Sequence, residues 1–199
     1  MEADRKRELI IEKASLRFAH FGIQKTTMNE IADDLSISKP LLYYYFPDKI
    51  RLVVAVVEKI LSEYQERLAV LFSCAEDIKE AIFAMLDLRR AFFQKYFMLH
   101  LVDHAEANLT KQELKKTISH IRIKEISLVQ EVLKKAADSN LIKSTDTEKT
   151  AELFIDMLTG INICVLARQD KHLVPDDKDF DEVLYKQKEL SQIFLSGIR

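Results

Sequence analysis

The sequence has few of the residues that interrupt helices, and few of those that form disulfide frameworks. It contains 3 glycines and 3 prolines in 199 residues. This favours long helices over an all-β fold. Two cysteines far apart in sequence, Cys74 and Cys164, argue against a disulfide framework and favour a reducing cytosol. No run of 18 apolar residues occurs and no signal-peptide core follows the first residues, so we expect a cytoplasmic protein without a membrane span.

An excess of positive charge is also missing. The formal net charge is −2, and residues 1–50 hold eight Lys or Arg and eight Asp or Glu. Composition therefore gives no support to nucleic-acid binding. Any such binding must depend on where a few cations lie, such as Lys25, Lys39 and Lys49. The affinity for DNA of non-specific sequence should then be modest and sensitive to salt.

What the sequence does have is helical periodicity along most of its length. Apolar residues recur at steps of three and four, and 48% of all residues are hydrophobic. We expect an all-α fold of about nine helices. One of them, residues 49–72, should be roughly 35 Å long. We expect a first domain in residues 1–48 and a second domain in residues 49–199, with that helix as the bridge.

The stretch from 26 to 49 predicts two short helices joined by a tight turn. Thr27 and Glu30 have the spacing of a capping box, which opens the first helix. Ser36 and Ile37 make the turn, and Ser38 is a natural N-cap for the second helix. This is the arrangement that places its second helix in the DNA major groove, so we expect residues 1–48 to be a helix-turn-helix DNA-binding domain.

The same stretch resembles the N-terminal domain of the tetracycline-repressor (TetR) family over roughly the first 60 residues. Ser36 stands where the family usually has glycine, which predicts mild strain from a positive φ. Leu41 replaces a polar residue and Tyr45 a frequent histidine, so the target sequence is open. The matching positions are Phe21-Gly22, Thr26-Thr27, Ile31-Ala32, Ser38-Lys39, Leu42-Tyr43-Tyr44, Phe46-Pro47 and Lys49.

Side chains and N–H groups around the second short helix are the predicted DNA contacts. Hydroxyl, ammonium and N-cap groups suit phosphates, and the start of the helix suits base edges, including apolar contact with thymine methyls. The alternative is that the three consecutive tyrosines are core, and we expect one of them to be. The predicted DNA-binding residues are Thr27, Ser38, Lys39, Pro40, Leu41, Tyr43, Tyr44 and Lys49.

The resemblance also implies a homodimer, formed by the last two helices of each subunit as a four-helix bundle. The alternative is that residues 153–166 are the central helix of a monomer. The predicted dimer contacts are Phe154, Leu158, Ile161, Val165, Leu184, Leu190 and Phe194.

A small effector bound in the second domain is a further implication of the resemblance. An apolar pocket with histidine or tyrosine groups would suit a hydrophobic or amphipathic molecule, although such aromatic residues are often ordinary core. No cofactor is expected. The candidate lining residues are Phe83, Met85, Phe92, Phe93, Tyr96, Phe97, His100, His104, Ile121, Phe154, Met157 and Leu158.

One fragment points to a different class of protein. His100 and His104 lie four residues apart, on one face of a helix, and could share a metal. Glu106 and His120 are conceivable third ligands. A metal-dependent helical hydrolase is therefore one alternative to a TetR-type repressor that binds a pseudo-palindromic operator. A DNA-binding regulator without a small effector is the other.

Overall fold

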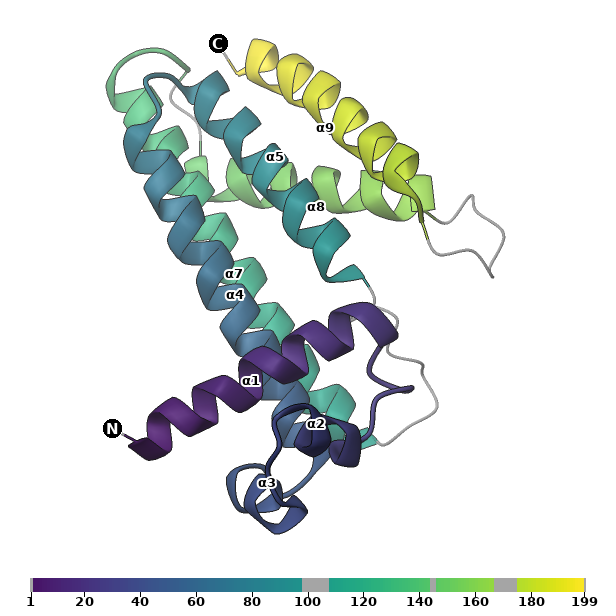
Figure 1. Ribbon diagram of the computed structural model, residues 1–199. Helices are drawn as coiled ribbons and strands as arrows, with labels where there is room; N and C mark the ends of the chain where they lie inside the picture. Colours follow the sequence, from purple (N-terminus) through teal and green to yellow (C-terminus); the bar gives the residue numbers. More distant parts are fainter. Residues whose placement is uncertain (1, 98–107, 144–145, 167–174, 199) are drawn as a thin grey trace. The chain divides into compact units, whose positions relative to one another are not determined.

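The computed structural model describes residues 2–97, 108–143, 146–166 and 175–198, which form eight helices and no strand (Figure 1). The all-α prediction is confirmed, with eight helices in these ranges where about nine were expected. No helix among the described residues is long and apolar enough to cross a membrane. The helices are α1 (Glu2–Phe21), α2 (Met28–Asp34), α3 (Lys39–Tyr45), α4 (Lys49–Cys74), α5 (Ile78–Lys95), α7 (Asn108–Asp138), α8 (Thr147–Leu166) and α9 (Asp177–Gly197).

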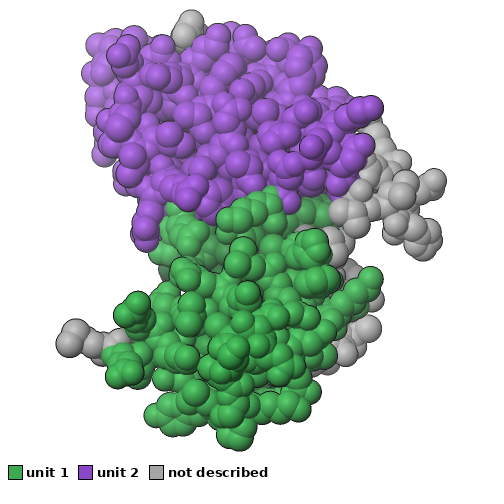
Figure 2. All heavy atoms as spheres, viewed as in Figure 1, with its two compact units in different colours: residues 1–63, 95–120 green, residues 64–94, 121–199 purple. Residues whose placement is uncertain are grey.

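The chain divides into two compact units (Figure 2). The first comprises residues 1–63 and 95–120, and the second residues 64–94 and 121–199. Three helices, α4, α5 and α7, therefore have residues in both units. The functional boundary predicted between residues 48 and 49 stays a prediction, while the packing places the first half of α4 with the N-terminal helices.

In the first unit, α1 forms the support for the short helices. Ile10, Ala14 and Phe18 recur at steps of four, which puts them on one face of α1, and all three are fully buried. The helix ends where Gly22 adopts a φ of 81° and its N–H donates to the carbonyl of Phe18 at 3.0 Å. Glycine adopts this conformation without strain, so the chain can turn directly into the segment that leads to α2.

The second unit is built around one apolar core to which α4, α5, α7, α8 and α9 all contribute. Gly160, in the middle of α8, has open space beside it within this chain, because a Cβ there would meet no atom within 4 Å. The buried members of the core are Tyr64, Leu68, Ile78, Ala81, Ile82, Met85, Leu86, Val129, Val132, Leu133, Ala136, Ile142, Ala151, Phe154, Ile155, Leu158 and Leu195.

A buried polar cluster joins three of these helices. Tyr64 on α4 donates its hydroxyl hydrogen to the carboxylate of Glu125 on α7, and Arg89 on α5 donates to the same carboxylate oxygen. Burial raises the pKa of Tyr64 well above its ordinary value, and the charge of Glu125 raises it further. Burial alone would lower the pKa of Arg89, but Glu125 raises it. The Tyr64 hydroxyl therefore stays protonated and the Arg89 guanidinium stays charged inside the core.

The packing of α8 against α9 also depends on a buried polar side chain. Gln187 on α9 donates from its amide to the carbonyl of Leu158 at 3.0 Å and to the side chain of Asn162 at 2.9 Å. Nearby Ser191, fully buried, donates to the carbonyl of Gln187 at 2.6 Å. Since a buried amide is costly without partners, these bonds fix the register between the two helices.

Candidate nucleic-acid interface

The capping box predicted for the first short helix is present. The Thr27 hydroxyl oxygen accepts from the Glu30 N–H at 3.3 Å, and the Glu30 carboxylate accepts from the Thr27 N–H at 2.7 Å. The Thr27 hydroxyl also donates to that carboxylate, at 2.9 Å. The two hydrogen bonds that the carboxylate accepts from Thr27 lower the pKa of Glu30, with the backbone N–H as the largest cause and the charge of Arg17 as a lesser one.

The turn between the two short helices has the predicted conformation. Ser36 adopts a φ of 51°, the left-handed region that favours glycine. Its N–H donates to the carbonyl of Asp33 at 3.0 Å, and the N–H of Ile37 donates to that of Ala32 at 3.0 Å. The turn therefore satisfies the backbone at the end of α2 while it holds a non-glycine residue in a strained conformation.

The second short helix, α3, packs through one side only. Ser38 caps it by accepting from the Leu41 N–H at 3.4 Å. Leu42 is fully buried and Phe46, one turn later, is 2% exposed. The two side chains cover α3 on the side that faces the unit, so the opposite side is left to solvent.

The outward side of α3 consists of predicted DNA-contact residues. Tyr44 is 79% exposed and Tyr43 45%, and Pro40 lies one turn before Tyr44 on the same side. Tyr45 is half-buried, so the expectation that one of the three tyrosines is core was wrong, because Leu42 and Phe46 already fill that space. Lys39 is exposed, and α3 contains no carboxylate. The outward side can therefore approach a polyanion without repulsion from α3 itself.

Charged side chains hold α1 against its neighbours in the same unit. The guanidinium of Arg17 pairs with Asp34 at 2.8 Å and with Glu30 at 3.0 Å, which ties α1 to α2. On α4, Lys59 pairs with Glu8 at 3.0 Å and Glu12 at 3.4 Å. Neither Arg17 nor Lys59 was singled out from the sequence. The signal that could have found Arg17 is the pair of carboxylates four residues apart on α2, which need a cation.

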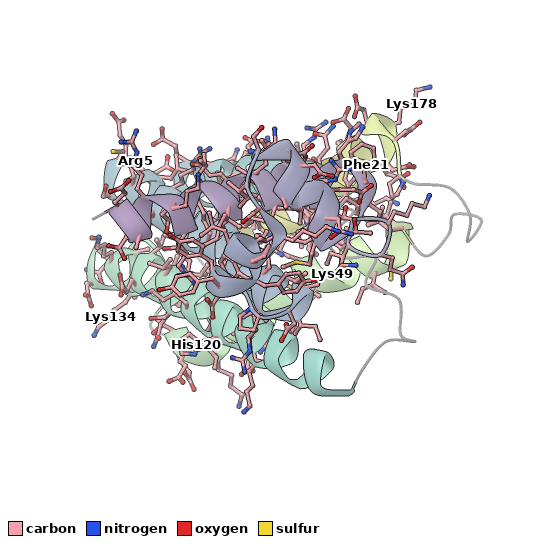
Figure 3. The ribbon with its side chains drawn as sticks, turned by 60° about the horizontal axis from the view of Figure 1, so that its bottom comes forward. Arg5, Phe21, Lys49, His120, Lys134 and Lys178 are labelled. Atoms are coloured by element: carbon pink, nitrogen blue, oxygen red, sulfur yellow. The ribbon has the colours of Figure 1, made fainter. Side chains whose placement is uncertain are left out.

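Two further cations lie close to α3: Lys49, which follows it in the chain, and Arg7 of α1, which contacts the Phe46 ring at its C-cap. Lys49, labelled in Figure 3, begins α4 and is half-buried. Its ammonium donates to the carbonyl of Gln24 at 3.5 Å, a long and weak hydrogen bond. Arg7 places its guanidinium 5.2 Å from the ring centre of Phe46. Lys49 can thus turn toward a phosphate at little cost, while Arg7 braces the end of α3.

Two short helices at this spacing, with a polar outward side on the second, define the chain as a helix-turn-helix protein. A sequence model described as "Bacterial regulatory proteins, tetR family" matches residues 10–56. A transcriptional regulator of Cytophaga hutchinsonii has a crystal structure with a TM-score of 0.86, 27% identity, and coverage of 97% of this chain and 98% of that one.

Two transcriptional regulators are also similar to this chain in sequence. The chain is 24% identical to the HTH-type transcriptional regulator YhgD of Bacillus subtilis over 90% of this chain and 91% of that one. It is 34% identical to the HTH-type regulator RutR of Escherichia coli over 55% and 53%. Residues 10–56 are thus a TetR-family DNA-binding domain, and the chain is a TetR-type DNA-binding transcriptional regulator.

Most of the predicted effector-lining residues in the described parts of the second unit are buried in its core or packed against it. Met85, Phe154 and Leu158 are fully buried in its core, so they offer no free surface. Phe83, Phe92 and Met157 pack against that core. Phe93 contacts the ring of Phe180, with centroids 5.8 Å apart. The remaining candidates are Tyr96 and Phe97, which fall in the first unit, and His100, His104 and the side chain of Ile121, which lie outside the described residues.

Two hollows lie on the second unit. One, of about 440 Å³, runs along α5 and is bordered by Phe83, Lys79 and Asp87. The other, of about 180 Å³, lies where Phe72 and Ile78 face α7. Phe83 is the predicted lining residue that borders the first, and none borders the second. The pocket therefore stays a prediction.

The predicted dimer contacts divide into buried and accessible ones. Phe154, Leu158 and Val165 are at most 5% exposed inside their own chain. Because Phe154 and Leu158 belong to the core of the second unit and Val165 is buried as well, these three side chains offer little surface to a second chain. Ile161, Leu184, Leu190 and Phe194 are half-buried. The large apolar side chains that α8 and α9 expose are instead Leu153, Ile163, Tyr185 and Ile193.

The histidine pair proposed as a metal site lies outside the described residues. Of its conceivable further ligands, His120 is exposed and Glu106 is likewise outside. Among the residues that the structure describes, no three His, Cys, Asp or Glu side chains are grouped as a metal site. The hydrolase alternative thus rests on the spacing of His100 and His104 alone.

Proposed function

We propose that this regulator is a repressor that binds a pseudo-palindromic operator as a homodimer, in the cytoplasm. The observation that carries the proposal is the outward side of α3, where Lys39, Pro40, Tyr43 and Tyr44 are exposed with no carboxylate among them. Tyrosine hydroxyls and the lysine ammonium suit phosphates, and the first turn of α3 suits base edges. A two-fold dimer places two such helices about one turn of DNA apart.

The dimer would form through the outward side of α8 together with α9. Leu153, Met157, Gly160 and Cys164 follow one another at steps of four, three and four, which is the spacing of a helix-helix seam. Gly160 has open space around it in the single chain, which suits close approach by a second helix. Leu190 and Ile193 would extend the apolar area onto α9. Of the dimer contacts predicted from the sequence, this assignment retains Leu190 and replaces the buried residues Phe154, Leu158 and Val165.

The dimer is tested by placing a charge on that surface. Leu153→Glu and Ile193→Glu change side chains that are 57% and 70% exposed, so each monomer should stay folded while association weakens. Ile123→Glu is the matched control, since Ile123 on α7 is 62% exposed and lies off the proposed interface. Sedimentation of all three proteins decides the matter. If the Leu153→Glu and Ile193→Glu variants self-associate as strongly as the Ile123→Glu control, the assignment is refuted.

The operator is found by selecting bound sequences from a random duplex pool, followed by a salt titration on the selected duplex. A palindromic consensus, bound by a dimer with affinity that falls steeply with salt, is the expected result. Lys39→Ala together with Tyr43→Ala should abolish binding with an unchanged thermal melt. A selected sequence without two-fold symmetry would contradict the dimeric mode, and a reporter gene behind the operator distinguishes repression from activation.

We further propose release by a small hydrophobic or amphipathic effector in the second unit. Such a molecule must bind the DNA-incompetent state more tightly than the competent one. Mass spectrometry of the denatured protein would reveal a co-purified molecule, and a thermal-shift screen of apolar compounds would find others. If neither yields a molecule that lowers operator affinity, the regulator works without a small effector.

A further inference from the structure

Arg17 occupies an unusual position for a cation in a DNA-binding head, because both of its charged contacts are acidic residues of α2. Its guanidinium lies 2.8 Å from Asp34 and 3.0 Å from Glu30, and its side chain is 18% exposed. The guanidinium also lies 5.2 Å from the ring centre of Phe21. These three contacts hold Arg17 in place on α1, with its charge directed at α2.

The carboxylate of Glu30 is held from both sides. One oxygen accepts from Arg17, and the other accepts the N–H of Thr27 at 2.7 Å and its hydroxyl hydrogen at 2.9 Å. The backbone N–H and the hydroxyl hydrogen of Thr27 are thereby both used inside the protein. The phosphate contact predicted for Thr27 would have to replace these bonds, so the local role of Thr27 is to anchor Glu30.

The charges on α2 make this arrangement significant for DNA binding. Between Met28 and Asp34, α2 has three carboxylates and no cation. The first helix of a helix-turn-helix crosses the phosphate backbone, where carboxylates are repelled. Asp33 is exposed, whereas Glu30 and Asp34 both pair with Arg17. One residue of α1 therefore pairs with two of the three carboxylates and reduces their combined charge from −2 to −1.

We propose that Arg17 is a positioning residue of the DNA interface, which offsets the charge of Glu30 and Asp34 so that α2 can lie against the phosphate backbone. This inference rests on the proposed operator binding and goes beyond it, since Arg17 touches no DNA. The sequence contains the same arrangement a second time, where Lys59 bridges Glu8 and Glu12 on α1. Lys59 therefore serves as an internal control, because Lys59→Gln removes one positive charge from a similar bridge elsewhere in the same unit.

The experiment compares four full-length variants with the wild type on the selected operator, over a range of salt. Arg17→Gln should weaken binding by roughly threefold to tenfold. Lys59→Gln should change it by less than about twofold. Adding Glu30→Gln and Asp34→Asn to Arg17→Gln should restore wild-type affinity within about twofold, since glutamine still completes the capping box. Glu30→Gln with Asp34→Asn alone should strengthen binding.

The dependence on salt separates positioning from direct contact. Because Arg17 releases no counterion in this account, Arg17→Gln should leave the slope of log affinity against log salt unchanged. A slope reduced by about 0.9 per head would show that Arg17 itself contacts a phosphate. If the triple variant binds as weakly as Arg17→Gln, Arg17 is a mechanical brace and the charge proposal is wrong.

Two further results distinguish failure of the Arg17 proposal from failure of the proposed operator binding. If Arg17→Gln melts early, the Glu30→Gln and Asp34→Asn variant still decides the matter, because weaker binding by that protein contradicts the proposal. If the wild type selects no operator, the proposed operator binding fails instead. The two failures are therefore told apart by the wild-type result.

Discussion

The buried cluster of Tyr64, Arg89 and Glu125 allows a prediction about stability. Replacing Arg89 with methionine keeps most of the side-chain volume but leaves the Glu125 carboxylate with the Tyr64 hydroxyl as its described partner. Glu125 is 5% exposed and Tyr64 is 6% exposed, so little water can take the place of the guanidinium. The variant should therefore contain a buried carboxylate that is no longer compensated by a cation.

The magnitude follows from what such a change costs elsewhere. Removing one partner of a buried ion pair destabilises a protein by about 3–5 kcal/mol. For chains of 150–250 residues, each kcal/mol lowers the melting temperature by about 2–4 °C. Arg89→Met should thus melt about 6–20 °C below the wild type. The double variant Arg89→Met with Glu125→Leu should recover part of this, because an apolar pair of similar volume needs no hydration, while the Tyr64 hydroxyl loses its acceptor at a cost of about 1–3 kcal/mol.

Thermal unfolding at pH 7, followed by circular dichroism at one fixed protein concentration, measures both variants. The concentration must be fixed because association with a second chain would raise the melting temperature. Lys186→Met is a suitable control, since Lys186 pairs with Glu182 at the surface of α9 and should change stability by less than about 1 kcal/mol. If Arg89→Met melts with the wild type, or if the double variant is as unstable as the single one, the account of a compensated buried charge is refuted.

Three further predictions concern single positions. Ser36→Gly relieves the strain of the left-handed backbone, roughly 1–2 kcal/mol, but destabilises the fold by roughly 0.4–1 kcal/mol because glycine makes the unfolded chain more flexible. The urea midpoint should therefore rise slightly, and a clear fall would contradict the strain. The pKa of Tyr64 is raised in the folded state, so the contribution of its hydroxyl to stability is full below about pH 10 and is lost as the pH rises further. Above pH 10 the wild type should therefore lose about 1.4 kcal/mol of unfolding free energy per pH unit relative to Tyr64→Phe, and an equal loss in both proteins would contradict this. Lys49→Ala should reduce the salt slope of operator binding by about 0.9 per head with an unchanged melt, and an unchanged slope would exclude a phosphate contact.

The helix-turn-helix could be predicted in detail because its determinants are local in sequence. Thr27 and Glu30, three residues apart, fix where α2 begins, and Ser38 fixes where α3 begins. The strained turn at Ser36 followed from comparison with a family that has glycine there. Each of these depends on neighbours within four residues, which a single sequence displays directly.

The contacts that could not be predicted join residues far apart in the chain. Arg17 and Asp34 are 17 residues apart, and Tyr64 and Glu125 are 61 apart. No periodicity within one helix specifies such partners. The tyrosine prediction failed for a related reason, since Leu42 occupies the core side of α3 and its neighbours have to lie outward.

The helix α8 shows why a periodic pattern leaves the dimer surface undetermined. It has two apolar sides, one with Phe154, Leu158 and Val165, the other with Leu153 and Cys164, and both recur at helical steps. Either side could pack against α9. The fold resolves the choice because Gln187 reaches the carbonyl of Leu158 from α9, which fixes that side inward. Leu153 is thereby left outward and 57% exposed. An apolar seam that stays exposed after the chain has buried its own core is what a second copy can cover, so the dimer should use the side of α8 that the aromatic residues do not occupy.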